Sequence, residues 1–316
     1  MLRKTLMGLA VVLALAAPSL VQAAGPNPKH VAADAKWYLH LDLEALRTTE
    51  LYKLVRAEVE KQFNLEEALA AIKQAAGVDP LNDIQGVTLY NTTHEQNVGG
   101  AIFYANIDQE LLLKALSQNP TYGQQKYGEY TVHTWQDKGK TPAGVFYKEG
   151  VVVVGDKIET LKVLIDVLDG KKAGGSELVK ERPGTFMLGA AKGLAELADR
   201  PNAKFLANAE SMELAMSEKA GKLAGSLAMT MVSAERAAQV KNMAEGVKSW
   251  VAFNPDAPKE VIDMVGKITL SVDGARVVAA FEQNSADFLK QLKNLDDRMH
   301  IFSPGDAGKG GAPEPQ

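Results

Sequence analysis

The residues best suited to chemistry are His40 and Asp42, which lie two positions apart in the predicted strand 37–43. Side chains alternate across a strand, so the two share one face. Together with His133 of another predicted strand they could form a two-histidine, one-carboxylate metal site of a hydrolase or oxidase. No H-E-x-x-H or similar spacing supports that site. The alternative is that His40 and Asp42 line the solvated face of a half-buried strand.

Methionine offers a second kind of chemistry, because every methionine after residue 7 lies in the second half of the chain. Met212, Met216, Met229 and Met231 fall on predicted strands. Their thioethers could bind Cu(I) or an adaptable apolar ligand. Filling of the core is the alternative, since Met229-Thr-Met231 is an isolated M-x-M and the others follow core periodicity.

The sequence lacks the motifs of the common enzyme and nucleotide-binding classes. It has no G-x-G-x-x-G after a first strand, no Walker-type G-K-[ST] and no G-x-S-x-G elbow. The absence of cysteine excludes disulfides, thiol catalysis, thiolate metal sites and a lipid anchor on cysteine. We therefore expect no cofactor and favour a protein that is not an enzyme.

The N-terminus predicts export. Arg3 and Lys4 precede an apolar run over 6–17, and small residues at Val21 and Ala23 suit cleavage after Ala23 by a Sec-type signal peptidase. The run is too short for a membrane span of about 20 residues. We expect a soluble periplasmic or secreted chain without a transmembrane span. Its formal charge of −4 gives no reason to expect a nucleic-acid partner.

Two stretches of the chain, 97–111 and 222–236, share one design. Each reads as a Gly-containing strand, a capping residue (Asp108 or Ser233) and a helix. Val98, Gly100, Ile102 and Tyr104 align with Leu223, Gly225, Leu227 and Met229 at an offset of 125 residues, which also aligns 87–90 with 212–215. The opening strand 37–43 aligns with 185–191 at an offset of 148. These alignments predict an internal duplication.

The extra residues of the first half are predicted to be helical. An amphipathic stripe begins at Leu51, a capping box at Asn64 and Glu67 restarts the helix, and Gly77 ends it. Further strands are predicted at 84–91, 98–106, 130–136, 144–147, 151–154, 268–272 and 275–281, with helices from Gln109, after Asp156 and from Ala286.

The sequence thus predicts an α+β fold in two internally duplicated halves, each a mainly antiparallel sheet covered on one face by helices. The predicted parts are a signal peptide (1–23), a leader (24–36), the first repeat (37–170), a connector (171–184), the second repeat (185–302) and a disordered tail (303–316).

The function favoured by the sequence is a non-enzymatic binding or interaction protein. Its partner would be an apolar ligand or an envelope protein held between the two halves, with the apolar helices of 51–76 as a lid or docking surface. The metal-assisted hydrolase or oxidase with His40, Asp42 and His133 is the alternative, and a purely structural component is a third possibility.

Overall fold

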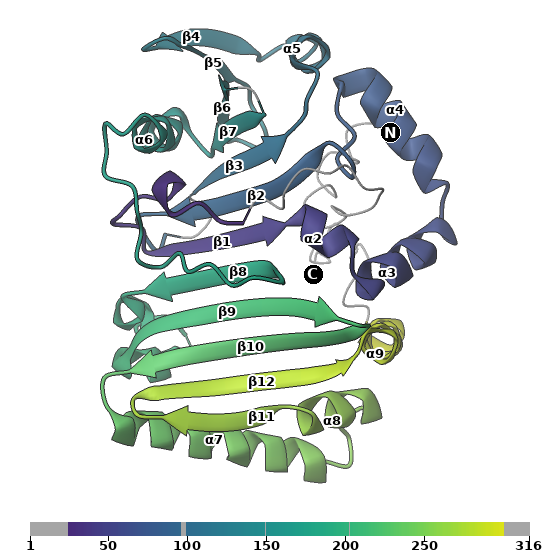
Figure 1. Cartoon of the computed structure of the whole chain (residues 1–316), viewed down its shortest axis with the longest axis vertical. Helices are drawn as coiled ribbons and strands as arrows, with labels where there is room; N and C mark the ends of the chain where they lie inside the picture. The colour runs from purple at the N-terminus through teal and green to yellow at the C-terminus, as the bar shows by residue number, and fades with distance from the viewer. Residues whose placement is uncertain (1–24, 96–98, 149, 202, 300–316) are drawn as a thin grey trace, which may run out of the picture.

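A computed structural model describes residues 25–95, 99–148, 150–201 and 203–299. Within them, twelve strands form one antiparallel sheet in the order β11-β12-β10-β9-β8-β1-β2-β3-β7-β6-β5-β4 (Figure 1). The predicted signal peptide and tail lie outside the described residues. The α+β class with an antiparallel sheet is confirmed.

The first half begins with the short 3-10 helix η2 and ends with α6. Its elements are η2 (Pro28–His30), β1 (Trp37–Asp42), α2 (Leu43–Arg47), α3 (Glu50–Glu60), α4 (Leu65–Ala76), β2 (Ile84–Asn91), β3 (Gly100–Ala105), α5 (Gln109–Ser117), β4 (Gly123–Tyr127), β5 (Tyr130–Thr134), β6 (Ala143–Lys148), β7 (Val151–Gly155) and α6 (Ile158–Leu168).

The second half repeats part of this order with fewer strands and a longer helix. Its elements are β8 (Thr185–Lys192), η3 (Leu194–Leu197), η4 (Lys204–Asn208), β9 (Ala209–Lys219), β10 (Lys222–Met231), α7 (Ala234–Phe253), α8 (Lys259–Gly266), β11 (Thr269–Asp273), β12 (Arg276–Asn284) and α9 (Ser285–Met299).

The helix ends follow the local signals. Asn64 caps α4 by accepting from Glu67 N, and Gly77 ends the helix in the left-handed conformation at φ 68°. Asp108 and Ser233 cap α5 and α7, as predicted. The prediction that Asp156 caps α6 is wrong, because the N-cap of α6 is Lys157. The Asp156 carboxylate accepts from the Thr160 hydroxyl instead.

The two halves meet at the antiparallel pair β1–β8 in the middle of the sheet. Outward from this pair, the first half runs β1-β2-β3-β7-β6 and the second runs β8-β9-β10-β12-β11. The first half adds β5 and β4 beyond. The predicted repeat therefore agrees with the strand order, whereas its origin by duplication stays a prediction.

The predicted alignment of the third strands is off by one residue. Leu89 pairs with Ala101, whereas its equivalent Leu214 pairs with Leu227, 126 residues after Ala101. A shift of one residue moves every side chain to the other face. Gly100 and Gly225, aligned in the sequence, therefore lie on opposite faces of the sheet.

We name the two faces by one residue each. The His40 face also carries Thr88 and Leu188, which pair with His40 across the strands, and the Leu227 face carries Leu214 and Leu39. On the first-half part of the His40 face, α6 and the segment 25–36 cover the largest core cluster, which includes Tyr90, Ile102 and Ile165.

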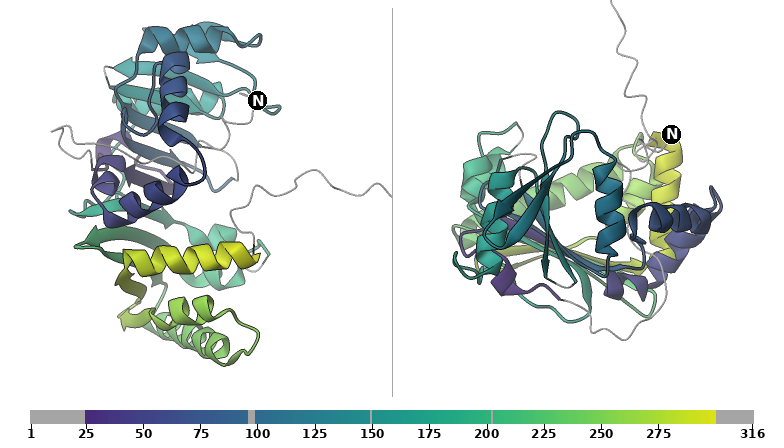
Figure 2. Two further views of the ribbon diagram at one scale, coloured as in Figure 1. Left: turned by 90° about the vertical axis from the view of Figure 1, so that its right-hand side faces the viewer. Right: turned by 90° about the horizontal axis from the view of Figure 1, so that it is seen from above.

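The closing helices α6 and α9 lie on opposite faces of the sheet. Helix α6 places Leu164 over Gly100 on the His40 face, and α9 stacks Phe288 on Phe281, the cross-strand partner of Gly225 on the Leu227 face. In Figure 2 the helices accordingly lie on both sides of a strongly twisted sheet. The sequence predicted helices on one face of each half. In the structure the closing helix lies on the His40 face in the first half and on the Leu227 face in the second.

Candidate functional site

His40 and Asp42 lie in the core, with 1% and 5% of their surfaces exposed. The interpretation that they line a solvated face is therefore wrong. The prediction of the shared face is correct, but this face is covered, and Trp37, Leu39 and Leu41 on the opposite face are only partly buried. The cover comes from segments distant in sequence, so the alternation within β1 alone did not reveal it.

His40 belongs to a buried polar network that anchors the N-terminal segment. Its Nδ1 lies 2.8 Å from the Thr88 hydroxyl, and its ring meets that of Tyr104 edge to face. The Tyr104 hydroxyl lies 2.8 Å from His30 Nδ1, and the two rings stack. Burial lowers the pKa of His30, which favours a neutral ring. These contacts give His40 a packing role.

Asp42 has a structural task as the N-cap of α2. Its carboxylate accepts from Ala45 N at 2.8 Å. Burial raises the pKa of Asp42, and the hydrogen bonds and Arg47 oppose that shift. Arg47 donates to Ile84 O and keeps a positive charge beside Asp42 and Glu44.

His133 lies far from His40 and on the other face. Cross-strand pairing places it beside Gly144, Val154 and Ala101, in the row that holds Leu39 on the Leu227 face. Strand β5 is five strand spacings from β1, or about 24 Å. Its Nδ1 lies 2.8 Å from the Tyr122 hydroxyl. The sheet therefore does not bring His40, Asp42 and His133 together.

No group of three or more metal-ligating side chains is found in the described part of the chain. Two cavities in the described part of the chain are lined mostly by charged and polar side chains. One, of about 600 Å³, lies at the turn between α3 and α4, and the other, of about 430 Å³, lies between α8 and α9. Neither contains His40, Asp42 or His133.

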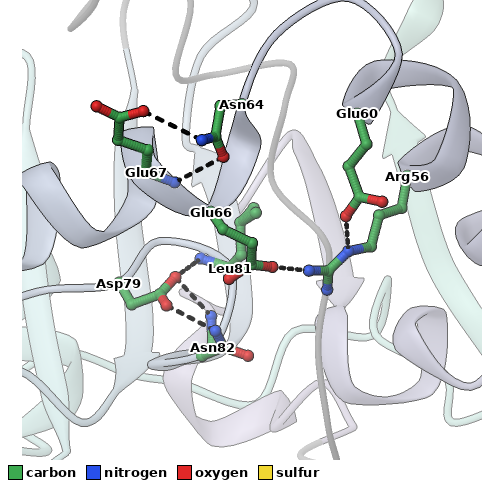
Figure 3. Close-up of polar contacts among 8 residues, drawn as sticks. All are labelled: Arg56, Glu60, Asn64, Glu66, Glu67, Asp79, Leu81 and Asn82. Atoms are coloured by element: carbon green, nitrogen blue, oxygen red, sulfur yellow. Dashed lines mark hydrogen bonds and ion pairs between the residues drawn. The ribbon is translucent and has the colours of Figure 1, made fainter.

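The turn between α3 and α4 is held by ionic contacts (Figure 3). Arg56 of α3 donates to Glu60 in the same helix and to Glu66 in α4. Asp79 closes the loop after α4 by accepting from Leu81 N and from Asn82. The predicted lid helices are therefore fixed to each other, and α3 contacts α9 through the pair Glu58–Lys293.

The four methionines share one face but differ in burial. Met231 is 2% exposed in a core cluster under α7, and Met212 and Met229, which pair directly across β9 and β10, pack against that cluster. Met216 pairs with Met187 of β8 and with Gly225, and is partly exposed. Core filling thus accounts for three of the four, and Met216 is left to line a surface.

A row of apolar side chains crosses the Leu227 face of the sheet, and the search for single site residues in the sequence did not find it. Cross-strand pairs align eight partly exposed aliphatic side chains, with buried Gly189 between Leu214 and Leu39. We call this row the apolar strip: Leu270, Ala279, Leu227, Leu214, Leu39, Leu89, Ala101 and Val154.

Helices flank the apolar strip at both ends of the strands. Toward one end lies the cluster of Leu194, Met231 and Ala237 under η3, η4 and α7. Toward the other lie the cluster of Leu43 and Val87 beside α2, and the α9 contact at Phe281. Leu227 remains 41% exposed between these helices, although β10 has a neighbour on each side.

A separate charged cluster ties the connector to the second half. Glu213 of β9 accepts from Lys180 at 2.7 Å, from Arg182 at 2.5 Å and from Arg276 of β12 at 2.7 Å, and its side chain is 14% exposed. The hydrogen bond from Arg276, aided by Lys180 and opposed by burial, lowers the pKa of Glu213 to about 2.

This cluster predicts an acid-sensitive contribution to stability. A lowered carboxyl pKa stabilises the fold above the unfolded value of 4.5, and the contribution is lost as the pH falls from there toward 2. Glu213→Gln should lower the free energy of unfolding by about 2 kcal/mol at pH 7 and by almost nothing near pH 2. Urea titrations at several pH values measure this, with exposed Glu210→Gln as control. A loss that is independent of pH would contradict the assignment.

Comparison with known proteins gives only a distant likeness. No family model and no curated protein matches the chain. Crystal form III of TP0453 is 8% identical, with a TM-score of 0.46, over 87% of this chain and all of that one; form IV is 8% identical, with a TM-score of 0.47, over 85% and 97%. In the described part, no helix is long and apolar enough to span a bilayer.

Proposed function

We propose that this protein is a non-enzymatic binding protein that holds an apolar ligand on the apolar strip. The observation that carries the proposal is Leu227, a leucine in the middle of an interior strand that is 41% exposed. The solvated face of an antiparallel sheet normally carries polar side chains, so an exposed leucine at the centre of this sheet is unusual. A continuous exposed apolar surface of this kind is typical of a binding site.

The composition of the apolar strip specifies an uncharged ligand. Leu270, Leu227, Leu214 and Leu39 offer only methyl groups, so a ligand is held by burial of apolar surface. Met216 and Met187 border the strip on the same face and can adapt to the ligand shape. Among the four methionines, Met216 is therefore the best candidate for a ligand contact. Met212 and Met229 lie at the border between the apolar strip and the core cluster under α7, and Met231 packs beneath them in that cluster.

The strip also crosses the junction between the two halves. Leu214 belongs to the second half and Leu39 to the first, with Gly189 between them. A Cβ at Gly189 would lie 3.2 Å from Leu39 Cδ1. The glycine therefore leaves space above the strand where the two halves meet. A ligand lying along the strip would contact both halves, which agrees with the expected site between them.

The N-terminal sequence supports a place of action outside the cytoplasm. The basic residues Arg3 and Lys4, the apolar run 6–17 and the small residues before Ala24 form the pattern of a cleaved signal. We propose a periplasmic or secreted protein that begins at Ala24. The strip would then serve an apolar molecule of that compartment.

Native mass spectrometry of protein exported by a bacterial host tests the proposal first. We expect a non-covalent adduct of lipid or another apolar molecule on the chain 24–316. An adduct-free chain that also fails to bind the uncharged fluorescent apolar probe Nile red would refute it. The same spectrum reports the mass expected for cleavage after Ala23.

A single charge in the apolar strip should abolish most of the binding. Leu227→Asp should weaken the binding of uncharged Nile red about tenfold or more, because the carboxylate must lose its water when the probe covers it. Ser226→Asp is the matched control, since it places the same charge on the neighbouring residue and the opposite face. Equal affinities of the two variants, both folded by circular dichroism, would show that the strip is not the site.

A further inference from the structure

Helix α7 exposes an apolar stripe that the proposed ligand site does not use. The exposed fractions are 54% for Met243, 56% for Val247, 67% for Trp250 and 87% for Phe253. Their spacing of four, three and three residues places them on one side of the helix. Ala237 on another side is fully buried against the sheet. We call these four residues the α7 stripe.

The α7 stripe is large enough to mark an interface. An aromatic side chain covers roughly 200 Å², so Trp250 and Phe253 alone expose about 300 Å² per molecule. Two copies contribute about 600 Å² from these rings. Met243, Val247 and a polar rim bring the total toward the roughly 1,200 Å² at which specific interfaces begin.

The residues that share this side of α7 do not favour a lipid surface. An interfacial membrane helix carries lysine and arginine along its polar border. Here the same side presents Glu235, Arg236, Gln239 and Asn242, with Gln239 bonded to both Glu235 and Arg236, and the loop after the helix adds exposed Asp256. This border holds one arginine, two carboxylates and no lysine, so it suits a protein partner rather than a lipid surface.

We propose that two copies of this chain pair through antiparallel α7 helices, related by a two-fold axis between Gly246 and Val247. This axis brings Met243 of one copy against Trp250 of the other, a favourable sulfur–aromatic pair. An interface of this isologous type closes at two molecules.

Gly246 supplies the space for close approach at the centre. A Cβ at this position would meet nothing within 4 Å in its own chain, so no internal contact requires the glycine. In a helix interior glycine costs about 1 kcal/mol relative to alanine. In the dimer, the missing side chain leaves room for Val247 of the other copy.

Sedimentation of the chain 24–316 tests the pairing. We expect a dimer at micromolar concentration, and Trp250→Asp should raise its Kd by about 30-fold or more. The matched control is Ala252→Asp, because this exposed residue lies on the far side of the same last turns. A monomeric wild type, or equal effects of the two variants, would overturn the proposal, as would monomers that bind phosphatidylcholine vesicles through Trp250.

Single cysteines give an independent readout, since the natural chain has none. Gly246→Cys lies at the proposed axis and should form a disulfide-linked dimer under mild oxidation, whereas Ala252→Cys should not. Adding Trp250→Asp to Gly246→Cys should reduce the cross-linked fraction at least tenfold. Equal cross-linking of the two cysteine variants would exclude this geometry even if a dimer exists.

Discussion

Replacing Gly155 by alanine should lower the free energy of unfolding by about 4 kcal/mol. A Cβ at Gly155 would lie 2.6 Å from Leu161 N and 2.7 Å from Lys157 O, which are backbone atoms of the first turn of α6. Backbone atoms cannot rotate away. The helix would have to lift from the sheet, which exposes the buried Leu164 and Ile165.

Gly100 provides the matched comparison. It pairs with Gly155 across β3 and β7, and its added Cβ would overlap the methyl groups of Leu164. Those methyl groups can move by a change of rotamer, so Gly100→Ala should cost only about 1–2 kcal/mol. Urea unfolding followed by circular dichroism measures both variants. Equal losses would mean that α6 adjusts as easily as a side chain and that the backbone contact is not limiting.

The same two glycines show how much of the fold was predictable. The Gly-containing alternation correctly predicted a strand in its described part, Gly100–Ala105, and Asp108 correctly predicted the start of the next helix. Both signals are local, because they act within one strand or one helical turn. The face on which Gly100 lies is not a local property, since it depends on the pairing with β2 and β7, and Gly225, its aligned equivalent in the sequence, lies on the other face.

The polar strand β4 shows a different limit. Its sequence Gly-Gln-Gln-Lys-Tyr contains no apolar alternation, and no strand was predicted there. It is an edge strand that pairs with β5 alone. Since an edge strand can leave much of its surface in water, the hydrophobic pattern that predicted β2 does not apply.

The candidate site was accessible to sequence reasoning only in part. Single residues such as His40 and Met231 attract attention by type, and both are buried. The apolar strip consists of ordinary aliphatic residues, one from each of several strands. Leu227 was placed in a predicted strand, but its neighbours Leu214 and Ala279 follow from the register, which one sequence does not determine.

Glu218→Ala should lower the free energy of unfolding by about 3 kcal/mol. The Glu218 carboxylate accepts from Glu50 N at 2.5 Å, from Leu51 N at 2.9 Å and from the Ser285 hydroxyl at 2.6 Å. Hydrogen bonds to a charged group contribute about 1.5–3 kcal/mol each, and partial exposure of Glu218 reduces their sum. The negative charge also lies at the positive end of α3.

The position of Glu218 makes this loss more than a local one. Glu50 and Leu51 begin α3 in the first half, whereas Ser285 begins α9 in the second. The carboxylate thus fixes a helix of each half to β9, beside the border of the apolar strip. Removing it should free both helix ends at once, so the amide hydrogens of Glu50 and Leu51 should exchange faster than in the wild type.

Urea unfolding and amide exchange together test this role. Glu218→Gln keeps one acceptor oxygen but loses the charge, and should cost about half as much as the alanine variant. Exposed Glu210→Ala on the same strand should change the stability by less than about 0.5 kcal/mol. If Glu218→Ala loses as little stability as Glu210→Ala, water has replaced the carboxylate as the hydrogen-bond acceptor. The contact between α3 and α9, which includes the pair Glu58–Lys293, would then be enough to hold α3 against the second half. A full loss with faster exchange at Glu50 and Leu51 would instead show that Glu218 couples α3 of the first half to the second half.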